Sequence, residues 1–364
     1  MRLAGCTRAV TLWASLVFAT FSNTGHAHID TVRLSLAQLF LQADAVALAR
    51  IDAVSDRDFG GAGRQALLEV VTATVVEQFK GEDTAQVDFF LDAHGPAHYR
   101  AGDTVVLFLE TPDPHHPLAR HLNSGKLDYL SHQVRNTEHV VDEASLSDYR
   151  WVLGKYSDVL ANGKPAGVPS SVEAILMRML SSASPALVES ALIDWQNAGA
   201  GFHFDKRDVQ HLVAMTREDV RPINLRLSIL RMLASRQLVG PEAWDALFTQ
   251  TAEADLVPVV RSTRGFESRH FAPALLALLE SSSEPLAEAA TRALGHPIYT
   301  GSEAAVGTLL ESDSQRLNYA AVAALVGMKS EQSVAILQKA ARNHPNEKVR
   351  RLIDAKLGVA GAWG

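Results

Sequence analysis

The stretch from His344 to Gly358 reads HPNEKVRRLIDAKLG, and its pattern recurs along the second half of the 364-residue chain. Val349 and Leu357 are eight residues apart, so they lie on nearly the same face of an α-helix. Pro345 suits the first turn of this helix, and Gly358 is placed to end it. The stretch therefore predicts one helix with an apolar face that needs a partner.

Copies of this pattern follow one another at a nearly constant period. The segments SSSEPLAEAATRALG (281–295) and DSQRLNYAAVAALVG (313–327) place their apolar residues in the same frame. Six positions serve as apolar anchors: Leu187, Leu225, Leu256, Leu286, Leu317 and Val349. They are 38, 31, 30, 31 and 32 residues apart, and the long first interval contains the added GAGFHFDK (199–206). A single globular core would not impose such a period, so we expect a repeat architecture.

A second apolar run precedes each anchor helix. These runs begin at Ala174, Asp208, Ala243, Ala272, Ala304 and Ser333. Each repeat is thus a pair of helices that cannot bury its apolar face alone and must stack on its neighbours. Residues 171–364 are predicted to form an all-α solenoid of about six helix pairs.

The pattern formed by Pro345, Val349, Arg350, Leu357 and Gly358 resembles the second helix of the short HEAT repeats of bacterial and phycobilisome-lyase-like proteins. The resemblance covers roughly residues 171–360. It implies an extended helical surface that binds protein partners. The chain departs from the family pattern in VPVVRSTRGF (257–266), which is poor in helix formers. It departs again at Ala287, where an arginine is expected.

The first 27 residues have the organisation of a secretory signal peptide. Arg2 and Arg8 come before the apolar run AVTLWASLVFATF (9–21), and small residues stand at Gly25 and Ala27. The run is 13 residues long, whereas a membrane span needs about 20. We therefore expect cleavage after Ala27, a periplasmic or secreted protein, and no membrane insertion of the mature chain.

Composition limits the function classes further. The sole cysteine precedes the expected cleavage site, so a mature chain would have no disulfide and no cysteine-based metal or redox site. The formal net charge is −7, and it becomes more negative once the signal arginines are removed. An acidic, exported chain is a poor candidate for nucleic-acid binding.

The region between residues 28 and 143 has a different periodicity. A short amphipathic helix is predicted at 31–42. Segments with strand-like alternation or β-branched runs then begin at Asp44, Ala66, Gln86, Asp103 and Lys126. These features predict a small antiparallel β-barrel, which gives the whole chain an α+β multidomain fold.

The order of the helix, ADAVALARI, VVEQFKGE and RAGDTVVLFL resembles exported bacterial domains with the OB-type barrel of netrin-like and metalloprotease-inhibitor-like proteins. The chain lacks the disulfides of the animal members, so their inhibitory edge is not carried over to any residue here. A connecting helix is predicted at 145–160 with Ser145 as its cap. The Gly- and Pro-rich segment 161–170 is predicted to link the two domains, and 144–170 is assigned to helix and linker together.

Histidines are the first candidate for chemistry. Seven lie between residues 94 and 139, and DAHGPAH brings Asp92, His94 and His98 into one loop. Unpaired imidazoles with a carboxylate suit zinc or copper, so these three residues are the candidate metal ligands. The alternative is that these are solvated loop histidines, because the spacing matches no closed four-ligand site.

No catalytic motif is found: GxSxG, HExxH and a phosphate-binding loop are all missing from the sequence. No enzyme activity and no cofactor are therefore predicted. Arginines on the predicted helices are the candidate partner contacts, namely Arg226, Arg231, Arg264 and Arg350, and the alternative for each is a solvated helix face. The sequence favours an exported, noncatalytic protein-binding or scaffold protein with a partner in the cell envelope. The alternative function is a periplasmic metal-binding protein.

Overall fold

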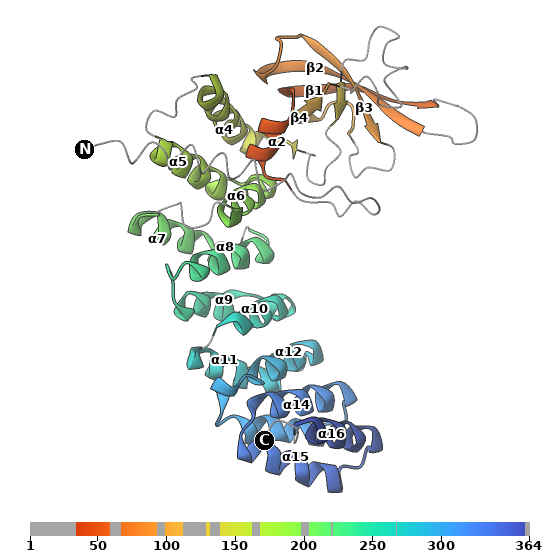
Figure 1. Ribbon diagram of the computed structural model, residues 1–364, viewed down its shortest axis with the longest axis vertical. Helices are drawn as coiled ribbons and strands as arrows, with labels where there is room; N and C mark the ends of the chain where they lie inside the picture. The colour runs from red at the N-terminus through yellow and green to blue at the C-terminus, as the bar shows by residue number, and fades with distance from the viewer. Residues whose placement is uncertain are drawn as a thin grey trace. The chain divides into compact units, whose positions relative to one another are not determined.

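The computed structural model describes residues 34–58, 67–92, 99–111, 129–131, 139–161, 168–197, 204–219, 221–266 and 268–360. It divides into two compact units, with the boundary between Asp208 and Val209. Unit 1 contains the strands and the first helices, and unit 2 contains helices only (Figure 1). The signal peptide expected at residues 1–27 lies outside the described residues.

A six-stranded sheet forms the body of unit 1. Its strands are β1 (Ala45–Asp58), β2 (Leu67–Lys80), β3 (Gln86–Asp92), β4 (Thr104–Glu110), β5 (Tyr129–Ser131) and β6 (His139–Val140). The order is β1-β2-β3-β5-β4-β6, and β1 also pairs with β4. All pairs are antiparallel except β3 with β5. The five predicted strands are therefore confirmed, although β5 is shorter than the segment from which it was predicted, and β6 is an additional strand of two residues.

The prediction of a β-barrel is wrong, because the sheet is not closed. In the described part of the chain β3 and β4 are joined through β5 alone, a strand of three residues. It pairs with β3 at Phe89 and Phe90, and with β4 at Leu109 and Glu110. So short a contact does not seal this side of the sheet. An antiparallel sheet that buries one face on a core needs no closure to be stable.

One end of β2 holds the short helix α2 (Leu36–Gln42) in place. Ser35 caps the start of α2 through its side chain and forms a capping box with Gln38. At the C-terminal end of α2, Lys80 Nζ from the end of β2 donates to the carbonyl oxygens of Phe40 (3.0 Å), Leu41 (2.9 Å) and Ala43. These carbonyls have no partner within the helix, so a lysine from β2 satisfies the C-terminal turn. Burial lowers the pKa of Lys80, and Asp44 partly offsets this.

Three longer helices, α4 (Glu143–Ala161), α5 (Val168–Ser181) and α6 (Pro185–Asn197), belong to the same compact unit. The Phe40 and Tyr156 ring centroids lie 5.6 Å apart. Arg150 Nε donates to Glu77 Oε2 at 3.0 Å, which ties α4 to β2. The first predicted helix pair, α5 with α6, thus lies in unit 1, whereas sequence placed it in the solenoid domain.

The cap of α4 differs from the prediction. Asp142 Oδ1 accepts hydrogen bonds from the Ser145 N–H at 2.8 Å and from the Ser145 hydroxyl. Asp142, rather than Ser145, therefore caps this helix, and Ser145 lies inside its first turn. The hydrogen bonds from Ser145 lower the pKa of Asp142, and burial opposes them weakly.

Unit 2 consists of successive helix pairs, as predicted. After α7 (Lys206–Met215), which spans the unit boundary, the helices are α8 (Ile223–Ser235), α9 (Asp245–Gln250), α10 (Leu256–Ser262), α11 (Ala272–Ala277), α12 (Glu284–Leu294), α13 (Glu303–Thr308), α14 (Gln315–Met328), α15 (Glu331–Asn343) and α16 (Glu347–Ala360). Short 3-10 turns, such as η4 (Thr263–Gly265) and η8 (Leu309–Glu311), extend several of them. Of the anchors in unit 2, Leu225, Leu256, Leu286 and Val349 are buried, and Leu317 is half-buried.

The second helices of the pairs, α8, α10, α12 and α14, follow one another on one side of unit 2 (Figure 1). Each packs against the next, and their buried residues form one continuous hydrophobic core. The stretch that departs from the family pattern forms only the seven-residue α10 and the turn η4. Trp244 covers it and donates from Nε1 to Ser262 Oγ at 2.8 Å.

Two glycines at the ends of second helices also mark close contacts. Gly295 is the C-cap of α12, as its place in the repeat predicts, and Gly327 lies in the last turn of α14. A Cβ at Gly327 would lie 2.2 Å from the carbonyl oxygen of Gly295, and a Cβ at Gly295 would lie 2.8 Å from Ala324 Cα. The end of α12 thus approaches α14 too closely for any side chain at these positions. Gly358 does not end α16 as predicted, because that helix continues to Ala360.

None of the helices in the described part of the chain combines the length and the apolar character that a bilayer crossing requires.

Candidate functional site

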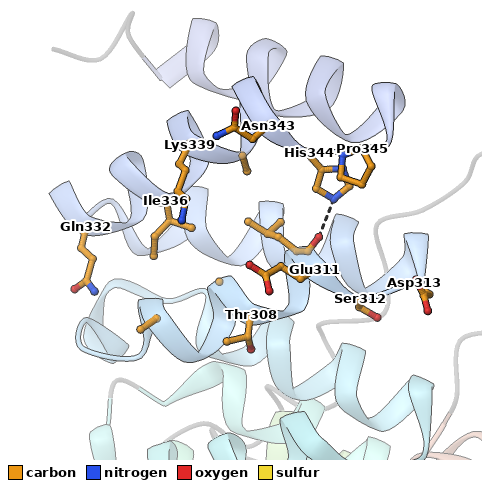
Figure 2. Close-up of a pocket in the computed structure, with 14 residues that line it drawn as sticks. Thr308, Glu311, Ser312, Asp313, Gln332, Ile336, Lys339, Asn343, His344 and Pro345 are labelled. Carbon is orange, nitrogen blue, oxygen red and sulfur yellow. Dashed lines mark hydrogen bonds between the residues drawn. The ribbon is translucent and has the colours of Figure 1, made fainter.

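A groove of about 560 Å³ lies between the first helices of two neighbouring repeats in unit 2 (Figure 2). The segment α13–η8 forms one wall and α15 forms the other. Ala304, Gly307, Ile336 and Ala340 supply apolar surface. A Cβ at Gly307 would lie 3.2 Å from Ile336 Cγ2, so a larger residue there would displace the isoleucine side chain.

Charged and polar groups surround this apolar surface, among them Glu311, Asp313, Lys339 and Asn343 (Figure 2). Side chains of both signs are present, so the groove has no strong preference for a charged ligand. An apolar centre with a polar rim is the composition of a protein contact surface.

His344 lies at one end of the groove, and its contacts indicate a structural role. Its Nδ1 accepts from the Asn346 N–H at 3.0 Å, and its Nε2 lies 2.7 Å from the Leu310 carbonyl oxygen (Figure 2). Because a carbonyl cannot donate, Nε2 is the donor to Leu310 and Nδ1 is the acceptor from Asn346. Both ring nitrogens are therefore engaged within the fold.

Serines make the same turn contact in other repeats. The hydroxyl oxygens of Ser182, Ser281 and Ser312 each accept from the backbone N–H two residues later, at 3.2, 3.0 and 3.2 Å. His344 thus occupies the position of a turn serine. Its longer side chain adds the bond to Leu310, which ties the last repeat to the one before it.

The predicted metal ligands are not brought together by any described contact. Asp92 ends β3, while His94 and His98 lie outside the described residues. Within the ranges that the structure describes, no group of three His, Cys, Asp or Glu side chains could hold a metal ion. The metal site in the histidine loop stays a prediction.

One of the seven histidines, His139, is buried in unit 1. Its Nδ1 lies 2.9 Å from the Tyr149 hydroxyl, which in turn lies 3.2 Å from Ser184 Oγ. Burial raises the pKa of Tyr149 to about 12, against the opposing effect of the Ser184 hydrogen bond. The phenol is therefore protonated at neutral pH, and this histidine belongs to a core network that joins β6 to α4.

Two of the four predicted partner contacts are engaged inside the fold. Arg226 is buried, and it donates from Nε to the Thr216 carbonyl at 2.6 Å and from Nη1 to Asp219 Oδ1 at 3.2 Å. Its burial removes its guanidinium from the exposed face on which a contact was predicted. Arg350 is half-buried and donates to the carbonyl oxygens of His344 and of Pro345, the latter at 3.1 Å.

The other two, Arg231 on α8 and Arg264 in η4, are exposed. Burial lowers the pKa of Arg264, with further lowering by the charges of Arg292 and Arg261 and an opposing effect of Glu288. The positive charges around Arg264 thus outweigh the negative one. Arg292, on α12, is not one of the partner contacts predicted from the sequence.

Glu288 holds two further arginines on this side of unit 2. Arg292 Nε lies 2.8 Å from Glu288 Oε1, and Arg316 Nε donates to Glu288 Oε2. Burial acts to raise the pKa of Glu288, but the hydrogen bonds from Arg292 and Arg316 outweigh it, and the net shift is downward. Because Arg316 belongs to α14, this carboxylate also links two successive second helices.

These features define unit 2 as a helical repeat structure with two exposed candidate surfaces, the groove and the arginine-bearing side. Comparison with known families agrees, since a model for HEAT repeats matches residues 272–355, from α11 into α16. A search of curated proteins finds no match. The HEAT match does not reach unit 1, and nothing supports the resemblance of that unit to netrin-like or metalloprotease-inhibitor-like proteins.

Proposed function

We propose that this protein is an exported, noncatalytic binding or scaffold protein whose helix pairs present a preformed surface to a protein partner in the cell envelope. The observation that carries the proposal is the array of stacked pairs with a HEAT-repeat match over residues 272–355. HEAT repeats are helical repeats commonly used for protein interaction. In such arrays the stacked helices supply one extended and rigid surface, so binding needs little ordering of the receptor.

Export is supported by the order of residues at the start of the chain. Arg2 and Arg8, the 13-residue apolar run and the small residue Ala27 occur in the order of a secretory signal. N-terminal sequencing of the protein recovered from the periplasm and the medium tests this part. We expect a mature chain that begins at His28, and a full-length chain that stays in the cytoplasm would contradict export.

Affinity capture with the mature, full chain tests the binding function. The tagged protein is incubated with an envelope extract, and retained proteins are identified by mass spectrometry against the tag alone. A retained protein is then purified and mixed with the full chain. We expect the two to co-elute in size-exclusion chromatography as one complex. If no retained protein forms such a complex, the proposed function is wrong.

A further inference from the structure

Five arginines lie on the exposed faces of four successive second helices. Each inner helix of the stack has neighbours on two sides and its own repeat's first helix on a third, so only one face meets solvent. The residues exposed on α10–η4, α12 and α14 include Arg261 and Arg264, Arg292 and Arg316, and Arg231 is exposed on α8, which packs against α10 at the start of this row. These five residues are called the arginine face below.

Few carboxylates balance this face. On the exposed sides of the same four helices only α12 carries acidic residues, Glu284 and Glu288. Glu284 accepts a hydrogen bond from Ser314 at 2.7 Å, and Glu288 pairs with Arg292 and Arg316. In the described part of the chain, Arg231, Arg261 and Arg264 form no ion pair. The face thus has an excess of positive charge in a chain whose formal net charge is −7.

We propose that the arginine face binds an acidic, extended segment of a protein partner. The inference rests on the proposed function and names the chemistry of the contact. Guanidinium groups bind carboxylates through two parallel N–H donors, and they lose less hydration than ammonium groups on burial. All five cationic groups on the face are arginine, so the face is suited to recognise carboxylates along a chain.

The size of the face sets the length of the segment. Packed helices lie roughly 8–10 Å apart, so α8 to α14 spans about 27 Å. An extended chain advances about 3.3 Å per residue, and roughly eight residues cover this distance. The segment therefore needs several Asp or Glu residues within about eight to ten positions. A nucleic-acid strand also carries regularly spaced negative charges, so it is one of the ligands compared in the test.

Fluorescence anisotropy with a labelled ten-residue peptide of alternating Glu and Ser tests the proposal on the mature, full chain. Peptides with Gln or Lys in place of Glu, and a ten-nucleotide thymidine strand, serve as comparison ligands. We expect the Glu peptide to bind most tightly, and its affinity to fall as salt is raised. The double variant Arg261→Glu/Arg264→Glu should weaken it by roughly tenfold or more, since two attractive contacts become repulsive.

Matched variants separate loss of the contact from loss of the fold. Arg261→Gln/Arg264→Gln removes the charges without adding repulsion and should weaken binding by a smaller factor. Arg342→Glu reverses an exposed arginine on the first helix α15 and should leave the affinity within about twofold. Thermal melting confirms that each variant is folded.

The proposal is overturned if the Gln peptide binds as tightly as the Glu peptide, if the thymidine strand binds more tightly than both, or if Arg342→Glu has the same effect as the double variant. Its failure is distinguishable from failure of the proposed function. A partner recovered by affinity capture that binds wild type and Arg261→Glu/Arg264→Glu equally would leave the binding function intact and reject the arginine face.

Discussion

Asp194 on α6 is a carboxyl group with an unusual environment. It is buried, and its Oδ1 has no hydrogen-bond partner among the described residues. Burial raises its pKa to about 7, although a hydrogen bond from Ser35 acts in the opposite direction. Its negative charge would in turn raise the pKa of Tyr156, which is already raised by burial. The protonated form is therefore the one that suits this core.

The shift makes the stability of the fold depend on pH. Between about pH 4 and pH 7 the unfolded chain has lost the Asp194 proton and the folded chain keeps it, so stability falls as pH rises through this window. Asp194→Asn cannot ionise and removes this dependence. We expect the stability of the variant relative to wild type to be greater at pH 8 than at pH 4.5 by roughly 3 kcal/mol, because most of the shift from 3.8 to about 7 acts between these two pH values.

Urea unfolding at the two pH values measures this difference. A stability difference between Asp194→Asn and wild type that is the same at pH 4.5 and pH 8 would contradict the assignment.

His344 allows a graded test of its structural role. His344→Ser should keep the turn contact that serines make in three other repeats, but it loses the bond to the Leu310 carbonyl. His344→Ala loses both. We expect a cost of about 1 kcal/mol for the serine variant and about 2 kcal/mol for alanine, measured by chemical unfolding. Equal costs for the two variants would show that the turn contact contributes nothing.

At the residue scale, the sequence predicted which arginines lie on helices better than it predicted what each guanidinium contacts. Arg226, Arg231, Arg264 and Arg350 all lie on predicted helices, yet two of them, Arg226 and Arg350, are buried or half-buried and donate to backbone carbonyls. A sequence does not show which carbonyls a turn leaves unpaired, and that determines where a guanidinium is used. Arg292 lies four residues after Glu288 on α12, a spacing that the sequence already shows, whereas only the stacking of α12 on α14 brings Arg316 to the same carboxylate.

At the scale of elements, the contact between α12 and α14 depends on two glycines. Gly327→Ala would place a methyl group 2.2 Å from the Gly295 carbonyl oxygen, so one helix must move. We expect a loss of about 2–4 kcal/mol, because overpacking against backbone cannot be relieved by a rotamer change. The melting temperature of the full chain measures it.

Gly358 provides the matched control. It lies in α16 with no atom within 4 Å of a Cβ built on it. Gly358→Ala should therefore be neutral or stabilise by up to about 1 kcal/mol, as expected for an open helical position. If Gly327→Ala is tolerated as well as Gly358→Ala, the close approach of α12 to α14 is not part of the native structure.

Most elements were predictable because their periodicities are local properties. The helix pairs, the buried anchors and the strands of unit 1 follow from apolar spacing along the chain. The open sheet and the cap of α4 did not follow. Closure depends on pairing between strands distant in sequence, and both Asp142 and Ser145 are good capping residues whose order only the backbone decides.

At the scale of the whole molecule, the boundary between the two units lies at a different position from the linker predicted from the sequence. The composition of 161–170 indicated a linker, yet the helices on both sides of it belong to unit 1. Contacts such as that between the Leu36 N–H and Ser190 Oγ join residues 154 positions apart, and no local pattern encodes them. The repeat period itself was predictable, because stacking imposes it on every copy.

The most direct test asks which side of unit 2 touches a partner in the cell. The photoreactive residue p-benzoylphenylalanine replaces Ala323, exposed on the second helix α14, or Ala335, exposed on the first helix α15. Both changes leave the arginine face intact. We predict that irradiation of living cells gives a crosslinked adduct with one protein partner from position 323 and none from position 335. Adducts from position 335 alone, from both positions equally, or from neither would contradict a contact surface on the second helices.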